Sequence, residues 1–227
     1  MFLCVLVSIA FTIFAGIYFL DDRRFFIISL LILVQAYIPF IFIFEKRKPP
    51  ARELVMIAVL IAVGVAGRAA FFMLPQFKPM VAVVIISGVA LGGETGFLVG
   101  AMTVLVSNIF FGQGPWTPWQ MFAMGLIGLL AGALFYNREK IISRWVLAIF
   151  GALATVIVYG GIMNPAGVIM IQPQPTREMF LFSFGSGFPF DLIHGIATAV
   201  FILIMARPIL EKIDRIKTKF AEFRHDS

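Results

Sequence analysis

Long apolar stretches that follow one another almost without interruption constrain this chain more than any other feature of its sequence. The first 44 residues contain two of them, Phe2–Leu20 and Phe25–Phe44, joined by a polar turn at Asp21–Arg24. A membrane-spanning helix needs roughly 20 apolar residues, whereas the alternating strands of a membrane barrel are not seen in this sequence. We therefore predict an all-α integral membrane protein. Six more predicted spans follow, at about Glu53–Phe72, Pro79–Leu91, Thr95–Phe111, Trp119–Tyr136, Trp145–Met163 and Phe190–Ala206.

The composition agrees with a membrane protein. Of the 227 residues, 61% are hydrophobic and 13% are charged, whereas a soluble domain carries roughly 25% charged residues. The single cysteine, Cys4, excludes an intrachain disulfide and a thiolate metal cluster, and we expect neither a metal site nor a cofactor. The stretch Phe2–Leu20 lacks a basic leader region and a small-residue cleavage site, so we interpret it as a retained span and not as a signal peptide.

Changes in composition divide the chain into four parts. A two-helix transmembrane hairpin at 1–44 is followed by a basic, proline-broken linker at 45–52 and by a six-helix membrane bundle at 53–206. The last part, 207–227, is a basic cytoplasmic tail. Apolar residues recur in this tail at helical spacing, which favours an amphipathic helix on the anionic inner leaflet over a dedicated partner site.

Lysine and arginine accumulate on one side of the predicted spans. That side carries basic clusters in the linker, in the turn Asn137–Arg144 and in the tail, whereas the other side carries only Arg23, Arg24, Lys78 and Arg177. Basic residues mark cytoplasmic loops. We therefore expect a multi-pass protein of the cell membrane with both termini in the cytoplasm. The net charge of +6 is attributed to this topology and not to nucleic-acid binding.

Three irregular loops are predicted on the outer side, at Met73–Lys78, Gly112–Pro118 and Asn164–Pro189. In these loops and their flanks, aromatic rings accompany amide and charged side chains, as in a pocket for a flat or partly apolar small molecule. An aromatic belt at the membrane surface is the alternative for Trp116 and Trp119. The candidate substrate-binding residues are Arg68, Phe72, Gln76, Phe77, Lys78, Asn108, Gln113, Trp116, Trp119, Gln120, Asn164, Asp191 and His194.

Charged residues within predicted spans are functional candidates by default, because a charge in lipid is costly. Arg68 is one of them, with Asp191 as its candidate partner, although its guanidinium could instead reach the membrane surface. Asp191 and His194 are three residues apart at a predicted helix start and so share a face. Asp191 could also complement the dipole of that helix, and no third metal ligand is spaced nearby.

Motifs of common enzyme classes are not present in the sequence. It contains no G-x-x-x-x-G-K-[ST] phosphate loop and no H-E-x-x-H metal motif. A G-x-S-x-G elbow is also missing, although Ser183–Phe188 imitates one. We therefore expect neither an enzyme nor ATP hydrolysis by this chain through a phosphate loop.

Small residues recur every four positions in the first helix after the linker. Ala58, Ala62, Ala66 and Ala70 line one flank of this helix, and we call them the alanine stripe. Small side chains let another helix approach closely, and close packing drives helix association in lipid. The stripe therefore indicates either packing inside the chain's own bundle or docking onto a partner subunit.

Two segments carry a resemblance to a known family, GRAAFFMLPQFKP (Gly67–Pro79) and SNIFFGQGPWTPWQMFAMGLIGLLAG (Ser107–Gly132). Together with the alanine stripe, they resemble the substrate-binding S components of energy-coupling factor (ECF) vitamin transporters, and look most like those associated with cobalamin uptake. The resemblance extends over about Ala51 to Arg207. The two helices predicted before Glu45 depart from the six-helix plan of this family.

This resemblance implies a mechanism. An S component captures its vitamin from outside, docks on a transmembrane coupling subunit carried by two ATPases, and topples in the membrane to release its cargo inside. Ala58, Ala62 and Ala66 then match the stripe that slides on the coupling helices, and the outer loops match the binding and gating loops. An S component for a different heterocyclic vitamin, or a scaffold protein without a ligand, is the alternative.

The expected topology predicts the reactivity of single cysteines. In a variant without Cys4, a cysteine at Lys48 or Lys140 will resist membrane-impermeant thiol reagents in intact cells, whereas a cysteine at Gln113 will react. Permeabilised cells provide the control, because every position then becomes accessible. The reverse labelling pattern would contradict the predicted orientation.

Overall fold

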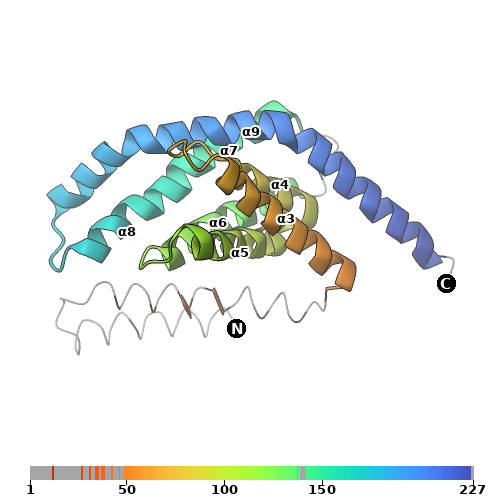
Figure 1. Cartoon of the computed structure of the whole chain (residues 1–227), viewed down its shortest axis with the longest axis horizontal. Helices are drawn as coiled ribbons and strands as arrows, with labels where there is room; N and C mark the ends of the chain where they lie inside the picture. The colour runs from red at the N-terminus through yellow and green to blue at the C-terminus, as the bar shows by residue number, and fades with distance from the viewer. Residues whose placement is uncertain are drawn as a thin grey trace.

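Every regular element is a helix in the part of the chain that the structure describes. The computed structural model describes residues 49–136, 138 and 142–225, together with single positions at 12, 27, 31, 34, 35, 37, 38, 42 and 46. The hairpin predicted at 1–44 falls outside this part except at those single positions. The elements, shown in Figure 1, are α3 (Ala51–Ala70), α4 (Met80–Leu91), α5 (Gly93–Phe111), α6 (Thr117–Phe135), α7 (Arg144–Ala154), the π-helix η1 (Thr155–Gly160), α8 (Gly161–Ile171) and α9 (Arg177–His225).

The described helices have the length and hydropathy of membrane spans. An all-α integral membrane fold is therefore confirmed for the described residues. The predicted span at Trp145–Met163 contains η1 and is continued to Ile171 by α8. The segments long and apolar enough to cross a membrane are Ala51–Ala70, Gly93–Phe111, Thr117–Phe135, Arg144–Ile171 and Arg177–Lys219, with the shorter apolar helix Met80–Leu91 beside them.

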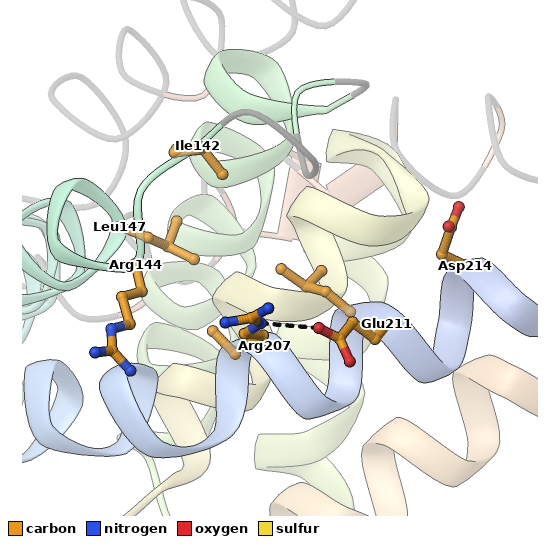
Figure 2. Close-up of a pocket in the computed structure, with 8 residues that line it drawn as sticks. Ile142, Arg144, Leu147, Arg207, Glu211 and Asp214 are labelled. Carbon is orange, nitrogen blue, oxygen red and sulfur yellow. Dashed lines mark hydrogen bonds and ion pairs between the residues drawn. The ribbon is translucent and has the colours of Figure 1, made fainter.

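The connections between helices divide between two ends of the bundle. Residues 71–79, 112–116 and 172–176 connect helices at one end, which we call the loop end. At the opposite end, which we call the basic end, α7 begins at Arg144 and α9 carries the ion pair of Arg207 and Glu211, with Nε and Oε1 2.8 Å apart (Figure 2).

α9 is a helix of 49 residues that arches over α7 and α8 and continues past the bundle (Figure 1). The predicted tail helix is therefore a part of α9. Its residue Ile213 is 7% exposed and packs with Ile57 and Leu91, so this part of its apolar face covers the basic end of the bundle. Lys217 donates a hydrogen bond to the carbonyl of Ala90 near the end of α4, where a positive charge complements the helix dipole.

The prediction of an irregular outer loop at Asn164–Pro189 is wrong. α8 continues to Ile171 and α9 begins at Arg177, and both Pro165 and Pro189 lie inside these helices. Backbone polar groups within a bilayer must be paired internally, so a helix is favoured there even across a proline. Only 172–176 connect the two helices as irregular chain.

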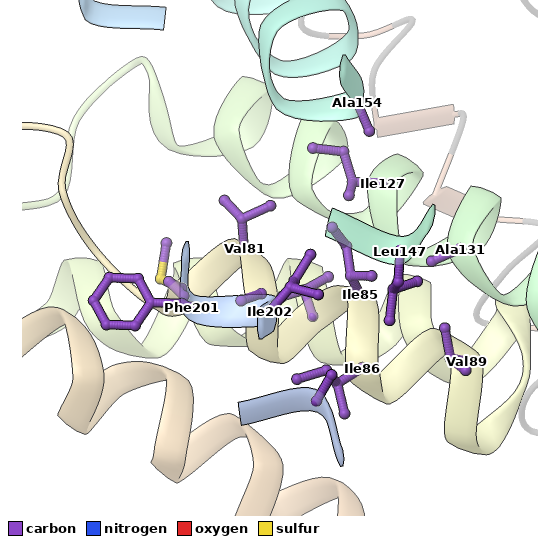
Figure 3. Packing of buried hydrophobic residues seen from close by; sticks show 14 of the residues in the cluster. Val81, Ile85, Ile86, Val89, Ile127, Ala131, Leu147, Ala154, Phe201 and Ile202 are labelled. Carbon is purple, nitrogen blue, oxygen red and sulfur yellow. The ribbon is translucent and has the colours of Figure 1, made fainter. Parts of the chain in front are cut away.

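α4 is the central helix of the bundle. All of its 12 residues are buried, as expected of a helix that is hydrophobic on every side. Figure 3 shows Ile85 and Val89 of α4 packed with Ile127 of α6, Leu147 of α7 and Ile202 of α9. A helix of this length rises about 18 Å, less than the bilayer core of about 30 Å, which is tolerated because protein and not lipid surrounds it.

Glycines bring α4, α5 and α6 into backbone contact. A Cβ atom on Gly128 of α6 would lie 2.2 Å from the carbonyl oxygen of Gly96 in α5, and one on Gly88 of α4 would lie 2.2 Å from the carbonyl oxygen of Gly128. No side chain fits at such distances. Gly92, with a φ of 95°, reverses the chain between α4 and α5 in a conformation that favours glycine.

Gly128→Ala will destabilise the protein by about 1–3 kcal/mol or more, because its methyl group must push α5 and α6 apart. Thermal unfolding in detergent measures the effect. Gly161→Ala is the matched control, since a Cβ atom there meets nothing within 4 Å and alanine favours a helix. Equal unfolding temperatures for the two variants would contradict the close approach of these helices.

Candidate functional site

Arg68 is the central residue of a polar group at the loop end. It lies in the last turn of α3, and its Nη1 donates to Ser107 Oγ at 2.7 Å and to Asn108 Oδ1 at 2.6 Å. The guanidinium also lies 5.1 Å from the centroid of the Phe111 ring, within the range of a cation–π contact. The charge of Arg68 is thus directed toward α5, where it bonds to neutral side chains.

Asn108 connects α5 to α6. Its side chain is fully buried, and its Nδ2 donates to Thr117 Oγ1 at 3.0 Å and to Gln120 Oε1 at 2.9 Å. Thr117 Oγ1 also accepts from the N–H of Gly114 at 3.3 Å. The amide that binds Arg68 therefore also holds the loop 112–116 and the first turn of α6 in place.

Tyr159 is a residue of this group that hydropathy and motif patterns miss. It lies in η1, where its hydroxyl shares a hydrogen bond with Gln120 and interacts electrostatically with Arg68. Single π-helical turns are frequent at functional sites, but no residue pattern predicts them. The sequence feature that could have indicated Tyr159 is its own hydroxyl group, which lies within a mostly apolar run of residues. We call the following residues the loop-end polar cluster: Arg68, Ser107, Asn108, Thr117, Gln120 and Tyr159.

A second polar group joins α8 to α9. Asn164 Nδ2 donates to Asp191 Oδ2 at 2.8 Å, and Ser183 Oγ donates to the carbonyl of Asn164 at 2.9 Å. Glycines make room for these side chains. A Cβ atom on Gly160 would lie 2.5 Å from the carboxylate of Asp191, and one on Gly187 would lie 2.4 Å from the amide of Asn164. The two helices are therefore close enough for a direct amide–carboxylate bond.

Asp191 and His194 lie within α9, which begins at Arg177. The prediction that they lie at a helix start is therefore wrong, and Asp191 is too far from the start of α9 to complement its dipole. Among the described residues, the predicted pair of Arg68 and Asp191 is not formed, because each bonds to an asparagine instead. His194 is 7% exposed, and its ring meets that of Tyr159 edge-on with the centroids 5.0 Å apart. His194 thus contacts the loop-end polar cluster through Tyr159, about one turn along α9 from Asp191.

Metal ligands are not grouped in the described part of the chain. It contains no group of three or more histidine, cysteine, aspartate or glutamate side chains that could hold a metal ion. The members of the loop-end polar cluster are instead amides, hydroxyls and a guanidinium. Such groups offer hydrogen-bond donors and acceptors to an organic ligand.

Phe72 and Phe77 have different surroundings. Phe72 is 54% exposed and stacks on Phe111 with the ring centroids 5.0 Å apart. Phe77 is half-buried and packs on Phe71 and Phe201, with centroid distances of 6.5 and 5.4 Å. Phe72 therefore extends an aromatic wall beside the loop-end polar cluster, whereas Phe77 anchors its loop to the bundle core.

Three of the candidate residues lie on the rim of this end. Gln76 is exposed with a φ of 57°, Lys78 donates to the carbonyl of Leu74 at 3.0 Å, and Gln113 donates to a backbone carbonyl of α5 at 3.1 Å. Burial and the positive charge of Arg68 hold the pKa of the Lys78 amine below its usual value. Lys78 and Gln113 thus bond to backbone carbonyls, and no hydrogen bond joins any of the three to the loop-end polar cluster among the described residues.

The two tryptophans of the loop end differ in their polar contacts. Trp116 is 41% exposed and lies against Gly114, where a Cβ atom would come within 2.4 Å of the indole ring. Trp119 is half-buried, and its indole nitrogen is buried without a hydrogen-bond partner among the described residues. A buried N–H without an acceptor is costly. The belt interpretation therefore suits Trp116 better than Trp119.

Tyr37, which precedes the linker, also contacts this end of the molecule. Its hydroxyl donates to the carbonyl of Pro118 at 2.7 Å. Its ring lies 5.7 Å from that of Phe97 and 6.1 Å from that of Phe122, measured between centroids. Tyr37 thus supports the first turn of α6, which carries Trp119 and Gln120, and no sequence pattern indicates this contact.

The alanine stripe lies on the exposed face of α3. All four alanines are exposed, and Val55 and Val59 beside them are 61% and 55% exposed. α3 packs against the bundle through its other side, with Ile57, Leu60 and Gly64. Packing inside the described bundle therefore does not account for the alanine stripe, which consists of Ala58, Ala62, Ala66 and Ala70.

Comparison with known proteins gives one family and several distant relatives. The sequence profile of the ECF-type riboflavin transporter S component family matches residues 50–215. UPF0397 proteins from two strains of Aliivibrio fischeri are each 29% identical over 117 residues, which covers 44% of this chain and 63% of those proteins. A UPF0397 protein of Aliivibrio salmonicida is 33% identical over 87 residues, covering 36% of this chain and 47% of that protein. No solved structure gives a significant match.

Proposed function

The chain belongs to the family of ECF-type riboflavin transporter S components, and from this premise we propose that it is the substrate-capture subunit of an ECF-type importer. It takes up a heterocyclic vitamin at the loop end, outside the cell, and passes it to the remainder of the importer. The distant UPF0397 relatives carry no ligand in their names, so the choice of vitamin is argued from the chemistry of the loop end.

The observation that carries this proposal is the loop-end polar cluster with the donor of Trp119 beside it. Arg68, Asn108 and Gln120 present charged and amide groups within a membrane domain, where polar side chains are costly and mark functional sites. The buried indole N–H of Trp119 lacks an acceptor among the described residues. A ligand with carbonyl groups supplies that acceptor and exchanges hydrogen bonds with the amides.

Riboflavin is the ligand that we propose first. Its isoalloxazine ring is flat and carries an N–H donor between carbonyl acceptors, which suits the amides of Asn108 and Gln120 and the guanidinium of Arg68. The exposed ring of Phe72 provides a stacking surface. The polar groups of Asn164 and the residues bonded to it suit the hydroxyls of the ribityl chain. The family name supports the same choice.

Cobalamin is the competing ligand. The resemblance of Gly67–Pro79 and Ser107–Gly132 to cobalamin-type S components favours it, and its peripheral amides would pair with the same amide side chains. The comparisons do not name cobalamin. A corrin ring is also much larger than a flavin, so the loops 71–79 and 112–116 would have to separate to admit it.

Delivery of the vitamin requires partners. We propose that the exposed alanine stripe of α3 docks on a transmembrane coupling subunit associated with two ATPase subunits, because small exposed residues allow a close helix contact in lipid. The chain contains no phosphate-loop motif of its own, so the energy of ATP hydrolysis comes from those subunits. The basic end then faces the cytoplasm, in agreement with its excess of lysine and arginine.

The choice of ligand is tested by equilibrium titration of the purified protein with riboflavin, cobalamin and other heterocyclic vitamins. We expect riboflavin to bind, and Trp119→Phe to weaken binding by up to about tenfold, because a hydrogen bond worth about 1 kcal/mol is lost while the ring remains. Trp145→Phe, at the basic end, is the matched control and will leave the affinity unchanged. Binding of cobalamin alone would reject riboflavin, and no vitamin binding at all would favour the scaffold alternative.

Docking is tested by Ala62→Leu in the complete importer. Leucine is a good helix former, but its side chain will hold the coupling subunit away from α3. We expect uptake into cells or vesicles to fall at least about tenfold, a loss of about 1.4 kcal/mol, while vitamin binding to the isolated protein is retained. Ala133→Leu, at an exposed alanine of α6, is the control and keeps full uptake. Unchanged uptake with Ala62→Leu would exclude the stripe as the docking surface.

A further inference from the structure

Tyr37 contacts the first turn of α6 although it precedes residues 50–215, the part of the chain that matches the family. Its hydroxyl donates to the carbonyl of Pro118 at 2.7 Å, across a sequence separation of 81 residues. Trp119 and Gln120 of the proposed vitamin site follow Pro118 directly. A residue outside the family match is therefore bonded to the segment that carries two candidate binding residues.

The hydrogen bond from Tyr37 acts on the backbone immediately before Trp119. The carbonyl of Pro118 and the N–H of Trp119 belong to one planar peptide group, so a bond that fixes the carbonyl oxygen also restricts the Cα atom of Trp119. A carbonyl oxygen has two lone pairs, and it can accept this bond in addition to one from the N–H four residues later in a helix. Tyr37 therefore restrains the start of α6 without disrupting it.

Two aromatic neighbours hold the ring of Tyr37 in place. Its centroid lies 5.7 Å from that of Phe97 and 6.1 Å from that of Phe122, and those two rings are 6.3 Å apart, all in edge-to-face geometry. Edge-to-face packing is a favourable arrangement of aromatic rings. Phe97 is 2% exposed, and a Cβ atom on Gly125 of α6 would lie 2.8 Å from its ring. The aromatic cluster therefore fixes the position from which the Tyr37 hydroxyl donates.

The first turn of α6 is held from two different sides. A buried amide of α5 donates to the side chains of Thr117 and Gln120. Tyr37, in contrast, contacts Pro118 and the ring of Phe122. With 3.6 residues per turn, these two pairs of residues point in directions roughly 150° apart around the helix axis. Loss of the contact on one side would therefore leave the turn restrained only from the other.

We propose that Tyr37 is a positioning residue of the vitamin site, which holds Trp119 and Gln120 in the orientation that binds the ligand. This inference rests on the proposed function, because it requires that these two side chains contact the vitamin. Tyr37 acts through α6 and not on the ligand, since its hydroxyl is bonded to Pro118 and its ring packs on two phenylalanines. By ordering the first turn before the vitamin arrives, it lowers the cost of binding.

Tyr37→Phe removes the hydroxyl and keeps the ring, so it tests the hydrogen bond alone. We expect the affinity for riboflavin, or for whichever vitamin binds the wild-type protein, to fall about threefold to tenfold in an equilibrium titration. Tyr136→Phe is the matched control and will keep full affinity, since Tyr136 follows α6 at the basic end and phenylalanine retains its ring contact with Lys217. Unfolding temperatures equal to that of the wild-type protein show that both variants are folded.

A double-mutant cycle with Trp119→Phe separates positioning from a general effect on stability. If Tyr37 acts by orienting Trp119, its hydroxyl matters less once the indole N–H has been removed. The double variant will then lose less affinity than the product of the two single losses. An effect on stability alone would multiply with the loss caused by Trp119→Phe. Fully multiplicative losses would therefore overturn the positioning role of Tyr37.

Hydrogen–deuterium exchange without any vitamin tests the contact independently of the ligand. We expect Tyr37→Phe to speed exchange of the backbone amides in residues 114–122 at least about threefold, and Tyr136→Phe to leave it unchanged. Wild-type affinity of Tyr37→Phe would overturn the positioning role, whatever its exchange rates, and would leave the proposed function intact. Absence of vitamin binding by the wild-type protein would instead reject the proposed function, and with it a role of Tyr37 at a vitamin site.

Discussion

The direct backbone contact of α4, α5 and α6 is the constraint on which the rest of the structure depends. Gly96 and Gly128 leave no space for a side chain between α5 and α6. Apolar surface alone does not hold helices together in lipid, so close packing must do so. The same approach brings Asn108 of α5 within 2.9 Å of Gln120 of α6 at the loop end. A wider spacing of these helices would break that bond and leave buried amides without partners.

The two ends of the bundle have different chemistry because different helical segments, with different side chains, meet at each end. At the loop end, the last turn of α3, the π-helix η1 and the first turn of α6 direct amides, hydroxyls and one guanidinium toward one another. At the basic end, α9 covers the ends of other helices with Ile213 and Lys217 and leaves its remaining charges outside. The polar side chains of the loop end and the charged side chains of the basic end are therefore separated by the length of the bundle.

Hydropathy predicts the helices well because a bilayer admits few other structures. Glycines and prolines indicate the irregular segments at 71–79 and 112–116. The helical part of Asn164–Pro189 could not be predicted in this way, since Pro165 and Pro189 usually end a helix in water. Residue type alone selected Arg68, Asn108 and Gln120 but missed Tyr159, which lies beside them in the π-helix η1. The partner of Arg68 was also mistaken, because a charge within lipid can be satisfied by neutral side chains as well as by a carboxylate.

Hydrogen–deuterium exchange with and without a saturating vitamin tests the central claim most directly, namely that the loop-end polar cluster holds the ligand. The account predicts slower exchange of backbone amides in the loops 71–79 and 112–116 and in the first turn of α6. It predicts no change in the part of α9 beyond Ala206 at the basic end. Slower exchange confined to the basic end, with the loop end unaffected, would contradict the account.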